Sequence, residues 1–161
     1  MGYTYGCFGV WNWGMPVTWL GPMWDFQTAL SQPSSTWMRH FAEFLSGIEW
    51  WRLEPRHDLI KNQSTNWLHK MVLSKTASGD LAVAYLPDNP NITLDMSSFA
   101  GTMTARWVNP VTNTWQTEPA PVANVGSHTF VKPAEWTDAV LVLSRRNRKI
   151  EASTQINPQV P

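Results

Sequence analysis

The stretch WLHKMVLSKTASGDLAVAYLP, residues 67–87, decides the fold of this chain. Its hydrophobic pattern has a period of two along Trp67–Ser74 and again along Leu81–Leu86, which is the period of a β-strand. Between the two runs, Ser78-Gly79-Asp80 supplies turn residues, and Pro87 ends the second run. The stretch therefore predicts an antiparallel hairpin.

The same pattern of short strands and turns continues towards the C-terminus. Short runs of strand-forming residues recur, and proline, asparagine and glycine separate them. The further predicted strands are Ile92–Met96, Met103–Val108, Thr114–Thr117, His128–Val131 and Ala139–Ser144. About seven short strands without intervening helices predict an antiparallel β-sandwich over residues 52–145. Residues 146–161 are polar and predict a flexible tail.

The first 51 residues have a different character, because seven of the eleven tryptophans lie there. Residues 2–13 read as a buried strand, residues 14–23 as a loop and residues 35–50 as an amphipathic helix. A strand, a loop and a covering helix make one unit of a β/α barrel, so residues 1–51 predict the end of an incomplete TIM barrel. A segment this short cannot hide seven indoles, since each removes roughly 150–250 Å² from water when buried. We therefore expect this segment to pack against a larger protein domain.

Composition excludes several classes of protein. Lys plus Arg and Asp plus Glu both number 12 among 161 residues, so a strongly basic nucleic-acid surface is absent. The sequence holds no apolar run long enough for a membrane span. Cys7 is the only cysteine, and the four histidines lack metal-ligand spacing, so we predict no disulfide, metal site or cofactor. A charged content of 15% suits a protein that handles neutral ligands.

Three motifs resemble those of one family. Gly2-Tyr3-Thr4-Tyr5-Gly6 with Val10-Trp11 resembles the last barrel strand of apiosidase-like glycoside hydrolases. Trp50-Trp51-x-Leu53-x-Pro55 is similar to the stretch that closes their barrel. Ala105-Arg106-Trp107-Val108-Asn109-Pro110 resembles a motif of the collagen-binding-like β-sandwich domain that follows that barrel. Family members often carry a glycine after the turn that follows Pro110, and here Asn113, which tolerates left-handed backbone, can take its place.

The resemblance implies a secreted or periplasmic TIM-barrel glycosidase that acts on the side chains of plant polysaccharides. Such enzymes use two carboxylates, and in this family they come from strands before the last one. We therefore expect no catalytic residue in this chain and no hydrolysis by the chain alone. Tyr5, Trp11 and Trp13, on or near the loop at the active face, are the candidate substrate contacts. The expected partners are a carbohydrate and the missing barrel portion of the same protein.

Two other roles remain open for the sandwich itself: it can be a non-catalytic module that binds carbohydrate or collagen, or a brace that covers an apolar flank of the barrel. The tryptophans of the sandwich, Trp67, Trp107, Trp115 and Trp136, are candidates for a binding surface. Of these, Trp107 alternates with Ala105 and Met103 and is predicted to lie in the core. We expect the aromatic side chains of the predicted helix to make core contacts; these are Trp37, Phe41 and Phe44.

Overall fold

The computed structural model of the chain describes residues 33–145. The chain divides into two compact units, Met1–Arg39 and His40–Pro161, and of the first unit only the opening of one helix is described. That helix is α2 (Pro33–Ser46). Three short 3-10 helices follow: η1 (Trp50–Arg52), η2 (His57–Leu59) and η3 (Trp67–His69). The strands are β1 (Leu53–Pro55), β2 (Val72–Thr76), β3 (Leu81–Leu86), β4 (Asn91–Asp95), β5 (Met103–Val108), β6 (Trp115–Thr117), β7 (Ser127–Val131) and β8 (Ala139–Arg145).

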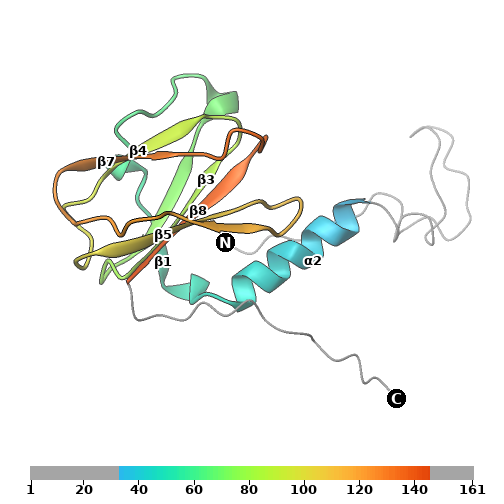
Figure 1. Ribbon diagram of the computed structural model, residues 1–161, viewed down its shortest axis with the longest axis horizontal. Helices are drawn as coiled ribbons and strands as arrows, with labels where there is room; N and C mark the ends of the chain where they lie inside the picture. Colours follow the sequence, from blue (N-terminus) through green and yellow to red (C-terminus); the bar gives the residue numbers. More distant parts are fainter. Residues whose placement is uncertain (1–32, 146–161) are drawn as a thin grey trace, which may run out of the picture. The chain divides into compact units, whose positions relative to one another are not determined.

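These strands form two antiparallel sheets. The larger sheet has six strands in the order β1-β2-β3-β8-β5-β6, and the smaller pairs β4 with β7 (Figure 1). Every neighbouring pair is antiparallel. Side chains from both sheets share one buried cluster, which makes the arrangement the β-sandwich that the sequence predicts.

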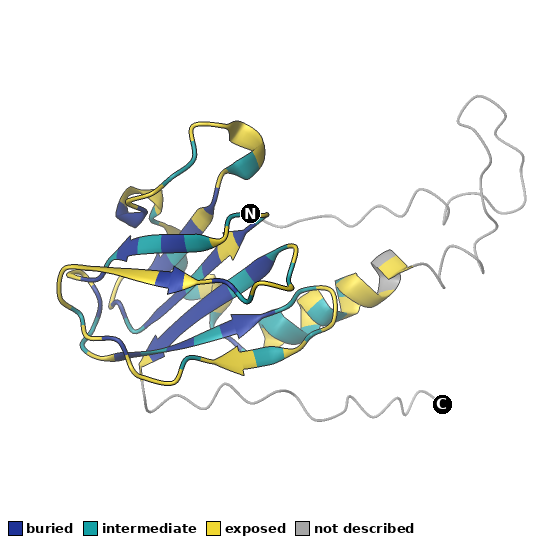
Figure 2. Ribbon diagram, turned by 45° about the horizontal axis from the view of Figure 1, so that its top comes forward, coloured by how far each residue is buried: buried dark blue, intermediate teal, exposed yellow. Residues whose placement is uncertain are grey.

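The inner face of the large sheet is a continuous apolar surface. One row across four strands joins Leu73, Ala84, Leu141 and Trp107, and the register places them directly opposite one another. All four are buried, as predicted for Trp107. The facing strands β4 and β7 contribute Ile92, Leu94 and Phe130 to the same cluster. Figure 2 shows this core as dark blue along the central strands.

The outer face of the large sheet is also apolar over part of its area, and this was not predicted. Leu81, Val108 and Val142 alternate with inner-face residues along their strands, yet all three are buried. They form a second buried cluster with Ile48, which follows α2 in the chain. Both faces of the sheet therefore need a cover, and the C-terminal part of α2 supplies one.

Two of the seven predicted strands have the observed bounds, four differ by a single residue at one or both ends, and one begins five residues too early. Strands β3 and β5 match the predicted ranges, but β2 begins at Val72 instead of Trp67. The preceding residues turn because the Asn66 side chain caps η3 and accepts a hydrogen bond from the Leu68 backbone N–H. The edge strand β1 was not predicted, since it has only three residues.

Two predicted turns are confirmed by their backbone angles. Gly79 lies between β2 and β3 with a φ of 72°, and Asn113 lies between β5 and β6 with a φ of 58°. Asn113 is the only residue other than glycine with a positive φ in the described part of the chain. Its tolerance of the left-handed region allows it to replace the glycine of the family pattern.

The predicted helix over residues 35–50 is present as α2, which ends at Ser46. The expectation of core contacts holds for Phe44, which packs against the second cluster. It is wrong for Trp37 and Phe41, which are 46% and 42% exposed. The predicted barrel strand and loop over residues 2–23, and the predicted tail over residues 146–161, lie outside the described residues.

Candidate functional site

The candidate site is the junction at which the end of α2 and the segment after it meet the outer face of the large sheet. Ile48 is 5% exposed and packs among Leu81, Val108 and Val142. Phe44 and Leu45, one helical turn earlier, flank the same cluster. Fully burying a side chain of this kind stabilises a fold by roughly 1.5–3 kcal/mol relative to leaving it exposed. The junction is therefore a packed interface within the second unit.

Trp115 belongs to this junction, although the sequence made it a candidate for an exposed binding surface. Its ring lies 6.1 Å from that of Phe44, and the guanidinium carbon of Arg106 lies 4.9 Å from its centroid. The side chain is partly buried against the second cluster. Burial lowers the pKa of Arg106, whose charge faces the indole. Trp115 thus serves packing, because the helix covers the strand on which it stands.

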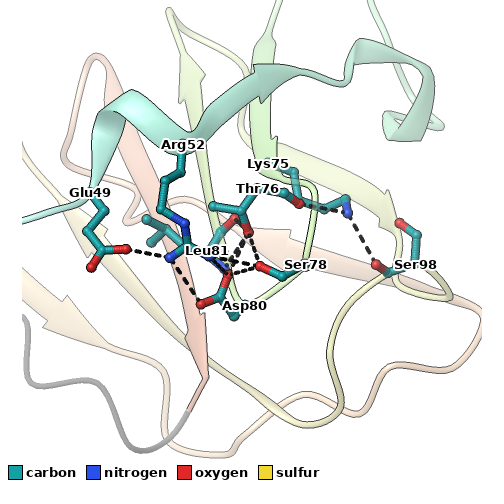
Figure 3. Close-up of polar contacts among 8 residues, drawn as sticks. All are labelled: Glu49, Arg52, Lys75, Thr76, Ser78, Asp80, Leu81 and Ser98. Carbon is teal, nitrogen blue, oxygen red and sulfur yellow. Dashed lines mark hydrogen bonds and ion pairs between the residues drawn. The ribbon is translucent and has the colours of Figure 1, made fainter.

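A polar network closes the other side of the junction (Figure 3). Arg52 reaches from η1 to the turn between β2 and β3, where its Nη2 lies 3.1 Å from Asp80 Oδ1 and donates to Ser78 Oγ at 2.9 Å. Its Nη1 forms an ion pair with Glu49. Asp80 Oδ1 also accepts hydrogen bonds from Thr76 Oγ1 at 2.7 Å and from Ser78 Oγ at 2.5 Å.

Asp80 is the acceptor on which this network converges. Burial opposes its ionisation, but hydrogen bonds from Ser78, Thr76 and Arg52 outweigh that cost and hold the pKa of the carboxyl group below its ordinary value. The carboxylate stays charged at neutral pH. It therefore fixes the linker after α2 to the hairpin turn with a charge-assisted contact.

The turn that carries Asp80 is itself held in place. A Cβ added at Gly79 would lie 2.7 Å from the Ser98 carbonyl oxygen, so the backbones of the two loops approach closely. The Ala100 N–H donates to the Gly79 carbonyl at 3.0 Å, and the buried Lys75 amine donates to the Ser98 carbonyl at 3.2 Å. Only glycine permits this approach at a positive φ.

A further contact ties α2 to the opposite edge of the sheet. Asn113 Nδ2 donates to Glu43 Oε2 at 3.0 Å, across 70 positions of sequence. The left-handed backbone at Asn113 belongs to the same turn. The junction is thus held by an apolar centre with a polar contact on each side, one at Asp80 and one at Asn113.

The predicted substrate contacts Tyr5, Trp11 and Trp13 all lie outside the described residues. Among residues 33–145, no group of three or more His, Cys, Asp and Glu side chains is placed to hold a metal ion. No helix in that range is both long and apolar enough to cross a membrane. Sequence reasoning missed the junction, because the residues that form it are far apart in the chain.

Comparison with known families agrees with this fold. Residues 55–144 match the family described as "Putative collagen-binding domain of a collagenase". The match spans more than half of the 161 residues. The chain belongs to this family. A comparison of the chain with curated proteins finds no match.

Two solved structures share the fold. One is named "Glycoside hydrolase", with a TM-score of 0.71 and 16% identity, and the match covers 81% of this chain. The other is a glycoside hydrolase family 5 protein from Bacteroides vulgatus ATCC 8482, with a TM-score of 0.69, 12% identity and 82% coverage. This collagen-binding-domain chain spans only 29% of the length of each.

Proposed function

We propose that this chain is the C-terminal part of an apiosidase-like glycoside hydrolase and that its sandwich braces the catalytic barrel. The observation that carries the proposal is the junction, where Ile48 is buried on the outer face of the sheet and Arg52 is paired with Asp80. Because these contacts hold the end of α2 and the residues after it against the sheet, unfolding of that segment also costs the contacts with the sandwich. The shared fold with much longer glycoside hydrolases supports the same reading.

In this proposal, residues 1–51 are the last strand, loop and helix of a β/α barrel. The loop after a barrel strand lies at the active face, so Tyr5, Trp11 and Trp13 contact the sugar there. An indole offers a flat apolar surface to the C–H face of a sugar ring. The acid/base and the nucleophile come from the portion before residue 1, and this chain supplies no catalytic carboxylate.

The exposed aromatic side chains of α2 fit the same proposal. Trp37 and Phe41 lie one helical turn apart and are each more than 40% exposed. The sheet covers the later part of the helix, through Phe44 and Ile48. In a barrel, such a helix packs its apolar side against the strands. We propose that the missing barrel covers Trp37 and Phe41.

The test uses the full-length parent enzyme with and without residues 52–161. If the sandwich is a brace, the deletion lowers the Tm of the barrel by several degrees or more, while KM for an apiose-bearing pectin changes less than about threefold. A fall in affinity with an unchanged Tm would contradict bracing and favour a binding module. Release of apiose by the full-length enzyme tests the specificity, and hydrolysis by the 161-residue chain alone would contradict the assignment of the carboxylates.

A second candidate function is collagen binding, which the description of the family favours. It is tested by sedimentation of the chain with insoluble type I collagen fibrils, with bovine serum albumin as the negative control. Co-sedimentation that saturates would support it. A chain that remains in the supernatant at all collagen concentrations would contradict it.

A further inference from the structure

Trp67 is the most exposed aromatic side chain among the described residues. It is 75% exposed, and the neighbouring Leu68 is 58% exposed. Both lie on η3, in the turn Asn66–Lys70, which we call the Trp67 turn. They do not belong to either buried cluster or to the junction. Packing of the described residues therefore does not account for an indole at this position.

The Trp67 turn is rigidly built, so the exposure does not come from a loosely held loop. The Gln63 side chain makes two hydrogen bonds with the backbone of the buried Met71: it donates to the carbonyl at 2.7 Å and accepts from the N–H at 3.0 Å. Ser64 Oγ accepts from the Asn66 N–H at 3.1 Å, and Asn66 Oδ1 accepts from the Leu68 N–H at 3.1 Å. A backbone held in this way loses little further freedom when the turn binds a ligand.

The last residue of η3, His69, makes a polar contact with Asp88. His69 Nδ1 lies 2.7 Å from Asp88 Oδ1, and the two side chains are 43% and 50% exposed. The other imidazole nitrogen, Nε2, has no hydrogen-bond partner in the described part of the chain. Asp88 fixes the orientation of the ring and keeps free acceptor positions of its own. An exposed indole on the same short turn as hydrogen-bond donors and acceptors is suited to a sugar, which has an apolar C–H face and a rim of hydroxyl groups.

The turn around Trp67 and Leu68 is polar. The residues on either side include the exposed Thr65, Asn66 and Lys70. Charges of both signs lie nearby, on Lys70 and Asp88, which favours a neutral ligand.

We infer that Trp67 and Leu68 form a binding platform for a neutral glycan, with His69 and Asp88 as its hydrogen-bonding edge. This platform is separate from the bracing role, because it uses none of the residues of the junction. It gives the sandwich a means of holding polysaccharide while the rest of the protein acts on it.

The test is affinity electrophoresis of the 161-residue chain in native gels. Three gels contain a neutral polysaccharide, which is arabinoxylan, pectic galactan or hydroxyethylcellulose, and a fourth contains the charged polygalacturonate. We expect at least one of these neutral polysaccharides to slow the chain. Trp67→Ala should weaken the apparent affinity at least tenfold, and Trp67→Phe should retain part of it. The matched control is Trp51→Ala, because Trp51 is 67% exposed and lies on η1 instead of the platform.

Four outcomes would overturn the inference. They are no retardation in any of the three gels, equal retardation of wild type and Trp67→Ala, retardation by polygalacturonate alone, and loss of collagen sedimentation instead of glycan binding in Trp67→Ala. Thermal unfolding of each variant verifies that it is folded. In the full-length parent, a fall in Tm that Trp67→Ala does not cause in the 161-residue chain would assign Trp67 to a barrel contact and also overturn the inference.

Discussion

Arg52 and Asp80 lie 28 positions apart in sequence, yet Arg52 Nη2 and Asp80 Oδ1 are 3.1 Å apart in the structure. The pair joins the linker after α2 to the hairpin turn between β2 and β3. The side chains are 34% and 27% exposed, so the charges are partly shielded from water. In the proposed bracing role, this contact joins the sandwich to the segment that precedes it.

Removal of this ion pair should destabilise the chain. In a double-mutant cycle of Arg52→Ala and Asp80→Ala, we expect a favourable coupling energy that is larger than that of a more exposed ion pair. Urea unfolding of the four proteins measures it. The control is the more exposed pair Arg56 and Asp58, at 37% and 61% exposure, whose coupling should be smaller. Equal coupling in the two cycles would contradict a special role for Asp80.

The same carboxylate should make stability depend on pH. The pKa of Asp80 in the folded chain lies below the value of about 3.9 for an unfolded aspartate. The ionised group therefore contributes its full stabilisation above about pH 4, and that stabilisation is lost as the pH falls through the folded pKa. Plots of Tm against pH should be less steep in acid for Asp80→Asn than for wild type. Some slope should remain, because hydrogen bonds from Ser97 and Lys61 also lower the pKa of Asp95.

The apolar centre of the junction should contribute more to the free energy of unfolding than the polar contacts at its sides. Ile48→Ala removes buried methyl groups from the cluster with Leu81 and Val142 and should cost about 2–4 kcal/mol of unfolding free energy. Trp51→Ala, at a side chain that is 67% exposed, should stay within about 0.5 kcal/mol of wild type. Chemical denaturation of both variants measures the difference. A small effect of Ile48→Ala would show that α2 is not firmly docked.

Position 79 should require glycine for two reasons: a side chain has no room there, and the backbone has a positive φ. Gly79→Ala places a Cβ 2.7 Å from the Ser98 carbonyl oxygen and adopts a φ of 72°. Gly126→Ala is the matched control, because its φ is 61° and nothing lies within 4 Å of the added Cβ. The strain of a left-handed residue costs roughly 1–2 kcal/mol in both variants. The close approach should make Gly79→Ala the more destabilised of the two in thermal unfolding.

Two substitutions at Asn113 should separate backbone conformation from the contact with α2. Asn113→Gly keeps the left-handed backbone at a φ of 58° but loses the hydrogen bond to Glu43. Asn113→Ala loses both. We expect Asn113→Gly to cost about 1 kcal/mol or less for the hydrogen bond, and Asn113→Ala to cost roughly 1 kcal/mol more. A Tm for Asn113→Ala equal to that of Asn113→Gly would mean that the turn is not strained.

The sequence by itself determined that the chain forms a sandwich, because strand periodicity and turn residues are local signals. The period of two placed β3 and β5 at their observed bounds and assigned Trp107 to the core. Turn chemistry identified Gly79 and Asn113, since backbone preference is a property of a few adjacent residues.

Only the tertiary structure decided the junction and the exposure of Trp67. Residues as distant as Glu43 and Asn113 meet because strand order and register bring them together, and alternation along one strand carries no information about such pairings. Alternation also marked only one face of the large sheet for the core, whereas α2 buries part of the other. The exposure of Trp67 depends on the cap by Asn66, which turns the chain before β2 and directs an apparent strand residue to the surface.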